Sequence, residues 1–166
     1  MPEPGFADAL DLLARADVEF VVVGMASAIL QGAPMLTNDV DIVHRRTAEN
    51  VARLLRVLTD LDAVYRTDRR RIRPVESALL GPGHNLFETR VGDLDCLGAI
   101  DQNLAYEQLE PDSLVLDLGQ GVHCRVLSLQ RLIEIKRRAG RPKDVAALPV
   151  LLATLDELRT REKPRP

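Results

Sequence analysis

Residues 36–44, LTNDVDIVH, place two aspartates, Asp39 and Asp41, on either side of one valine in an otherwise apolar segment. The segment predicts a strand, in which alternate side chains point to the same face, so the two carboxylates emerge together. Two carboxylates this close repel each other unless a cation lies between them. Mg²⁺ suits this role because it takes carboxylate oxygens and keeps positions for substrate phosphates. Alternatively, Asn38 and Asp39 form a turn and Asp41 is a solvated edge residue.

The segment before this strand predicts a second strand followed by a short helix. Residues 19–24, EFVVVG, are a β-branched run that ends at Gly24, as expected of a buried strand. Residues 25–32, MASAILQG, fit a helix that closes at Gly32, and Pro34 prevents its continuation. Backbone N–H groups at the start of such a helix bind anionic phosphate.

A third candidate carboxylate lies farther along the chain, in residues 92–98, GDLDCLG. Asp95 is flanked by apolar residues that face the opposite way on a predicted strand. If this strand is a neighbour of the first, Asp95 lies beside the earlier pair. Asp93 shares the face of Asp95 and competes for the same role, although its position next to Gly92 favours a turn.

The remaining patterns predict a mixed α+β domain, with a short mixed sheet flanked by helices and two helices at the C-terminal end. We expect one domain over residues 1–160 and a disordered tail over residues 161–166. The stretch 65–84 is ambiguous between a strand and an ordered loop. Helices are expected at 6–16, 47–60, 128–139 and 142–159, a strand–turn–strand unit at 85–100, and a hairpin of SLVLDL and VHCRVL around 119–121.

Composition limits the class of protein. The 166 residues are 46% hydrophobic and 28% charged, with 3% aromatic residues, which is a globular composition built on aliphatic packing. The net charge of −3 gives no global reason to bind nucleic acid. Two cysteines without a CxxC pattern argue against a disulfide framework or structural zinc. Neither a signal peptide nor a membrane-spanning run is visible, so we expect a cytoplasmic protein with no membrane partner.

Basic residues cluster in two places. Lys136 falls on the apolar stripe of the helix predicted from residue 128, where it either reaches a ligand or packs its stem with the ammonium in water. Asp144 follows Lys143 in the first turn of the last helix, where an acid also offsets the helix dipole. The second cluster has no interleaved aromatics and suits a solvated face, with RNA or nucleotide phosphates as the alternative; it comprises Arg66, Arg69, Arg70, Arg71 and Arg73.

Together these motifs resemble the nucleotidyltransferase fold superfamily, the β-polymerase-like group. More narrowly, the chain resembles the small bacterial nucleotidyltransferase-like proteins related to AbiEii-type toxins, over about residues 18–148. The motifs are Gly24-Met25, thirteen residues, Asp39-Val40-Asp41 and then Leu94-Asp95-Cys96, within the stretches VVGMASAILQGAPMLTNDVDIV and LIEIKRRAGRPKD.

This resemblance implies transfer of a nucleoside monophosphate from an NTP to a hydroxyl of RNA, a protein or a small molecule. Asp39, Asp41 and Asp95 would be catalytic and bind Mg²⁺ or Mn²⁺, with Lys136 as a further catalytic residue. A toxin–antitoxin role, with a cognate antitoxin or another partner protein, is also implied. The residues implied to contact the nucleotide are Gly24, Met25, Ser27, Lys136, Lys143 and Asp144.

The chain departs from the family pattern at two positions. Met25 stands where the second glycine of the pair is expected, and its side chain could crowd the phosphates. Met35 stands where relatives often carry a basic residue. A catalytically degenerate protein that binds a nucleotide or a partner therefore remains an alternative. A metal-dependent phosphodiesterase using the same carboxylates is a third possibility.

Overall fold

The computed structural model describes residues 4–164, in which one seven-stranded sheet has the strand order β3-β4-β5-β2-β1-β7-β6. The pairs β2–β5 and β1–β7 are parallel and the other pairs are antiparallel. The predicted mixed sheet is therefore confirmed. The strands are β1 (Phe20–Val23), β2 (Asp39–His44), β3 (Val64–Tyr65), β4 (His84–Thr89), β5 (Gly92–Leu97), β6 (Ser113–Gly119) and β7 (Val122–Leu127).

Residues 4–164 contain seven α-helices beside the sheet, and the last two form the predicted C-terminal pair. None of the helices in residues 4–164 is both long and apolar enough to cross a lipid bilayer. The helices are α1 (Pro4–Arg15), α2 (Gly24–Leu30), α3 (Ala48–Asp60), α4 (Glu76–Leu79), α5 (Tyr106–Leu109), α6 (Leu129–Ala139) and α7 (Pro142–Glu162), with a 3₁₀ turn at Glu110–Asp112.

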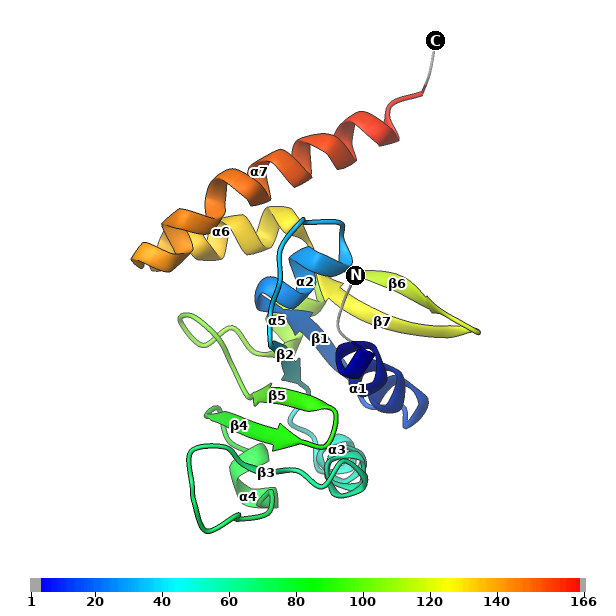
Figure 1. Cartoon of the computed structure of the whole chain (residues 1–166), viewed down its shortest axis with the longest axis vertical. Helices are drawn as coiled ribbons and strands as arrows, with labels where there is room; N and C mark the ends of the chain where they lie inside the picture. Colours follow the sequence, from blue (N-terminus) through cyan, green and yellow to red (C-terminus); the bar gives the residue numbers. More distant parts are fainter. Residues whose placement is uncertain (1–3, 165–166) are drawn as a thin grey trace.

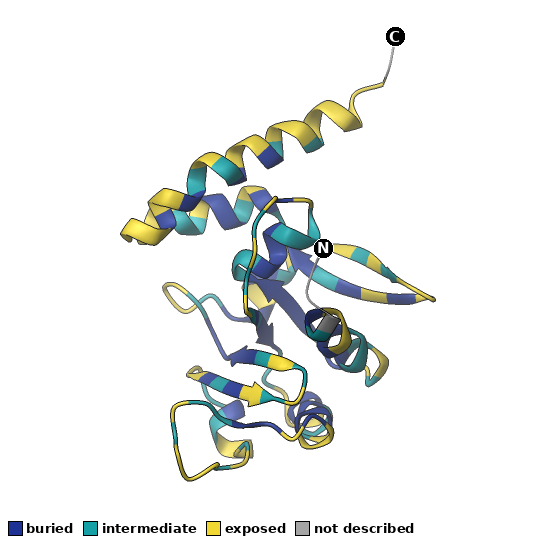
Figure 2. Cartoon of the chain, in the orientation of Figure 1, coloured by how far each residue is buried: buried dark blue, intermediate teal, exposed yellow. Residues whose placement is uncertain are grey.

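The sheet is covered on both faces, so its central strands are buried (Figure 2). Val22 and Ile42 lie in a cluster with α1, α3 and α4, whereas Val21 and Val43 lie in a second cluster with α2, α5, α6 and α7. This division follows from the alternation of side chains along a strand. Helix α7 packs on α6 at one end of the molecule, and its C-terminal part extends beyond the body (Figure 1).

Local signals correctly located several helix ends. The Ser128 hydroxyl accepts the Arg131 N–H at the start of α6, and Gly140 follows that helix with φ 63°, as a capping serine and a terminal glycine predict. Helix α7 runs to Glu162, past the predicted end at residue 159. The first two residues of the predicted disordered tail are therefore helical, and its last two lie outside the described residues.

The sequence patterns did not predict several short elements. The ambiguous stretch 65–84 contains the end of β3, the α4 turn and the start of β4. Helix α5 has four residues, which is too few to show a helical period. Helix α2 ends at Leu30, and Gly32 lies in the turn that follows it, with φ 102°. These elements depend on tertiary contacts more than on their own propensity.

Candidate functional site

The parallel pairing of β2 with β5 brings four aspartates onto one face of the sheet. Asp39 lies opposite Asp93, and Asp41 lies opposite Asp95. Neighbouring strands are about 4.8 Å apart, so side chains at paired positions are direct neighbours. The three predicted carboxylates, Asp39, Asp41 and Asp95, are therefore brought together by strands that are far apart in the sequence.

Gly24 carries the backbone of the β1–α2 turn directly against Asp41. The preceding residue, Val23, pairs with Asp41 across β1 and β2. A methyl group added at Gly24 would lie 2.6 Å from Asp41 Oδ2, and the Gly24 φ of +62° is unfavourable for residues with a side chain. Glycine thus leaves room beside the carboxylate and supplies the turn.

The electrostatics of the site disfavour the ionised form of Asp41. The pKa of Asp41 is raised to about 7, chiefly because the group is buried. The charge of Asp95, a hydrogen bond between Asp41 and Asp95, and the charge of Asp39 raise it further, while the charge of Arg66 lowers it. A carboxyl group with such a pKa is partly protonated at neutral pH. A cation placed among these side chains would restore ionisation.

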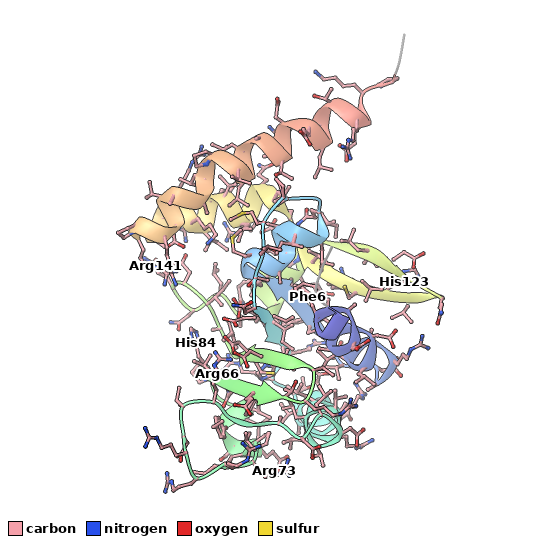
Figure 3. The ribbon with its side chains drawn as sticks, in the orientation of Figure 1. Phe6, Arg66, Arg73, His84, His123 and Arg141 are labelled. Carbon is pink, nitrogen blue, oxygen red and sulfur yellow. The ribbon has the colours of Figure 1, made fainter. Side chains whose placement is uncertain are left out.

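Arg66 contributes a positive charge to this cluster. Its Nη1 lies 3.1 Å from Asp95 Oδ1 and 3.2 Å from Asp93 Oδ2, and its Nη2 donates to Asp95 Oδ2 at 3.3 Å. Figure 3 shows Arg66 beside strands β4 and β5. The sequence placed this residue in a solvated arginine cluster, because nothing local separates it from the other arginines.

The residues present suit a divalent cation. Asp95 Oδ1 is buried and makes no hydrogen bond, since its contact with Arg66 lacks hydrogen-bond alignment. Carboxylate oxygens are the ligands that Mg²⁺ and Mn²⁺ take. In residues 4–164, no three His, Cys, Asp or Glu side chains converge closely enough to be ligands of one ion. A cation at this site would have to draw the aspartate side chains together.

Lys136 and Asp144 pair with each other at the junction of α6 and α7. Lys136 Nζ donates to Asp144 Oδ1 at 3.1 Å, and Arg141 Nε donates to Asp144 Oδ2 at 2.6 Å. Only 1% of the Asp144 side chain and 14% of the Lys136 side chain are exposed. Burial raises the pKa of Asp144, but the bonds from Arg141 and Lys136 outweigh it and lower the pKa overall. These contacts join two helices, whereas Lys143 is exposed.

The other residues implied to contact the nucleotide have internal partners. Ser27 is fully buried, and its hydroxyl donates to the Gly24 carbonyl at 2.7 Å. Met25 and Met35 are partly buried against the apolar cluster that includes Leu132 and Ile133 of α6. The Ser27 hydroxyl is therefore engaged inside α2, and both methionines contribute to the packing of this apolar cluster.

Comparison with known proteins gives a likeness in fold. No family model matches the chain, and no curated protein matches it by sequence. A crystal structure from Thermotoga maritima, described as a "putative nucleotidyltransferase", aligns with 92% of this chain and 96% of its own, with a TM-score of 0.57. The chain has a nucleotidyltransferase-like fold. Because the two sequences are 18% identical, the likeness extends to the fold alone, and activity must be argued from the aspartates themselves.

Proposed function

We propose that this protein is a Mg²⁺-dependent nucleotidyltransferase, which moves a nucleoside monophosphate from an NTP to an acceptor hydroxyl. One observation carries the proposal: Asp41 and Asp95 are paired on neighbouring strands, with Asp39 on the same face and the Gly24 backbone against Asp41. The fold of the Thermotoga protein supports it. Mn²⁺ has the same ligand preference and is the natural substitute in experiments.

Asp39, Asp41 and Asp95 are the side chains that would hold the cation. Bound Mg²⁺ would supply positive charge for an in-line displacement at phosphorus. The negative charge of the three carboxylates would attract the ion, and in this proposal Asp95 would take the proton of an acceptor hydroxyl. Gly24 allows a phosphate to approach the backbone. Helix α2 has only seven residues, so its dipole is a minor contribution beside the carboxylates.

Lys136, Lys143 and Asp144 have a less direct role in this proposal. To contact a phosphate, Lys136 would have to leave Asp144, to which it is bonded. We therefore propose that Lys136 and Asp144 support the nucleotide side of the site by fixing α6 against α7. Exposed Lys143 is free to meet a phosphate.

The acceptor and biological role are proposed from the resemblance to AbiEii-type proteins. Candidate acceptors are RNA, a protein hydroxyl and a small molecule, and a toxin role would require a cognate antitoxin. The exposed arginines of the β3–α4 loop suit an anionic acceptor. Arg66, at the start of this loop, contacts the aspartates, so an acceptor held there would lie close to them.

A second candidate function is a catalytically degenerate protein that binds a nucleotide or a partner. The observation favouring it is the Arg66 guanidinium, which lies against Asp95 where a cation would be held. In that case the arginine replaces the metal permanently, and the aspartates serve the fold. The phosphodiesterase alternative predicts metal-dependent cleavage without an NTP.

Thermal unfolding with each NTP, with and without Mg²⁺, tests the proposal. A ligand at 100 times its Kd stabilises by about 2.7 kcal/mol, which raises the midpoint by several degrees in a domain of this size. We expect a Mg²⁺-dependent rise in the wild type, none in Asp41→Asn, and an unchanged rise in the control Asp8→Asn, an exposed aspartate of α1. A rise that persists in Asp41→Asn would contradict the proposed site.

Two glycines provide a matched pair for the same measurement. Gly24 and Gly32 both have positive φ, but a methyl group meets Asp41 only at Gly24 and meets nothing within 4 Å at Gly32. Each change to alanine should cost on the order of 1 kcal/mol of folding free energy through backbone strain. Only Gly24→Ala should also abolish the nucleotide-dependent rise. Equal loss of that rise in Gly32→Ala would assign the effect to general destabilisation.

A further inference from the structure

We propose that Arg66 is a movable counter-ion of the cation site: it holds Asp95 when no cation is bound and is retained by Asp93 when one binds. The inference rests on the proposed function, because it concerns the same aspartates. It gives separate roles to Asp93 and Asp95, which the sequence left as competitors. It also explains how an arginine can lie beside the aspartates that we propose as cation ligands.

The first observation is that one nitrogen serves two carboxylates. Arg66 Nη1 lies 3.1 Å from Asp95 Oδ1 and 3.2 Å from Asp93 Oδ2. The two aspartates lie on the same face of β5, so a small rotation of the guanidinium can exchange one for the other. Asp93 is the more exposed of the two, with 32% of its side chain accessible against 10% for Asp95.

The second observation is that the contact with Asp95 is incomplete. Asp95 Oδ1 is buried without a hydrogen bond, although Arg66 is nearby. An ion pair with a well-aligned fork would use both carboxylate oxygens fully. This oxygen faces Arg66 Nη1 at 3.1 Å but accepts no hydrogen bond. A buried acceptor without a hydrogen bond is unfavourable in the cation-free protein, and a cation would satisfy it once the guanidinium moves away.

The third observation is that the arginine is anchored beside the site. Its backbone N–H donates to the Leu86 carbonyl, and Nη1 donates to the Phe87 carbonyl at 3.3 Å. Both carbonyls belong to β4, the neighbour of β5. Arg66 therefore stays near Asp93 and Asp95 whichever of them it contacts.

Charge decides which carboxylate Arg66 takes. With no cation, Asp95 faces Asp41 across the strands, and the guanidinium offsets their repulsion. A divalent cation among Asp39, Asp41 and Asp95 would repel the guanidinium, because like charges at such short range repel strongly. Asp93, opposite Asp39 at the outer end of the pairing, then keeps Arg66 without competing for the ion.

Calorimetric titration with Mn²⁺ alone tests the inference without relying on catalysis. We expect Arg66→Gln to tighten Mn²⁺ binding by about tenfold or more, because a competing charge is removed. Arg66→Lys should bind Mn²⁺ with an affinity between those of Arg66→Gln and the wild type. Arg73→Gln is the matched control, since it removes a charge from the same loop at a residue paired with Asp62 on the surface. Its Mn²⁺ affinity should match that of the wild type.

A double-mutant cycle tests the role of Asp93. Asp93→Asn should weaken Mn²⁺ binding in the wild-type background, because Arg66 then has only Asp95 as a partner. The loss should be much smaller in Arg66→Gln, where there is no arginine to retain. An equal loss of Mn²⁺ affinity in both backgrounds would mean that Asp93 acts only through its own charge. It would overturn the proposal that Arg66 exchanges Asp95 for Asp93.

The outcomes separate this inference from the proposed function. Unchanged or weaker Mn²⁺ binding in Arg66→Gln overturns the counter-ion role, even if NTP still stabilises the wild type. Tighter Mn²⁺ binding in Arg66→Gln supports it, even if no NTP stabilises either protein, in which case the proposed transfer reaction fails alone. Absence of Mn²⁺ binding in both proteins overturns both. Thermal unfolding of Arg66→Gln without metal establishes that the variant is folded.

Discussion

At the scale of single residues, Asp41 is held in a position that opposes its ionisation. Its neighbours Asp39 and Asp95 are also acids, Asp95 is buried, and Asp41 itself is partly buried. Residues that lower the stability of a fold are retained where function needs their charge. Replacing Asp41 should therefore improve the fold while it removes the proposed activity.

We predict that Asp41→Asn is more stable than the wild type, with a difference that depends on pH. The pKa of Asp41 is raised from 3.8 to about 7, so the folded wild type binds more protons than the unfolded chain between these values. Wild-type stability consequently falls as the pH rises from about 4 to about 7. The free energy of unfolding should favour Asp41→Asn by about 4 kcal/mol at pH 8, and the difference should be small near pH 4.

Urea unfolding of both proteins across pH 4 to 8, without metal, measures this difference. A difference that stays constant with pH would show that Asp41 is not protonated in the folded protein. A second titration in the presence of Mg²⁺ should reduce the advantage of Asp41→Asn, because only the wild type would gain a bound ion.

The residues of the site differ in how readily sequence predicts them. Asp41 and Asp95 follow from local alternation, since each lies between apolar residues on a strand, and Asp39 shares the face of Asp41 two residues away. Arg66 does not, because its role depends on β3 and β4 folding beside β5, and four similar arginines follow it within a few residues. Lys136 was correctly placed at the apolar face of its helix, but its partner Asp144 belongs to the next helix, whose orientation no local pattern gives.

At the scale of elements, helices α6 and α7 are joined by a buried ion pair within an otherwise apolar interface. Asp144 is almost fully buried between Lys136 and Arg141, beside Ala147 and Leu151 of the core. A buried ion pair contributes little net stability, but loss of one partner leaves the other charge uncompensated. The ion pair therefore affects the relative orientation of the two helices more than it adds to the net free energy of unfolding.

We predict that Asp144→Ala lowers the free energy of unfolding by about 3 kcal/mol, because Lys136 is left partly buried without its partner. The double variant Lys136→Met, Asp144→Leu should recover most of this loss, since both charges are removed. Glu157→Ala, at an exposed position of the same helix, is the control and should change stability by less than about 0.5 kcal/mol. Urea unfolding at pH 7 measures all three, and an equal loss in the double variant would contradict this account.

At the scale of the whole molecule, the site lies where distant parts of the chain meet. Strand β2 pairs with β5 and β1 pairs with β7, both in parallel, so long connections separate the partners. Sequence periodicity identified most of these strands but not their order, because pairing between distant segments leaves no local signal. The class of fold was therefore predictable, while the seven-strand order needed the structure.

Residues in the C-terminal half of α7 contribute unequally to the stability of the protein. Leu151 and Thr154 are buried, whereas every residue from Arg159 to Pro164 is exposed. We predict that truncation after Leu158 changes the free energy of unfolding by less than about 1 kcal/mol. Truncation after Val150 removes the buried Leu151 and should cost about 3 kcal/mol or more. Thermal unfolding of the two truncated proteins measures this, and a large loss from the shorter deletion would indicate an unrecognised contact of the helix end.

The parallel pairing of β2 with β5 also affects the order of folding. Asp41 and Asp95 are separated by two further strands and two helices along the chain, so their contact closes a long loop and is slow to form. Their mutual repulsion begins only when β5 docks on β2, which raises the barrier of that step. If Asp41 and Asp95 hold a divalent cation as proposed, its charge would lower this barrier, so the ion would also accelerate the completion of the sheet.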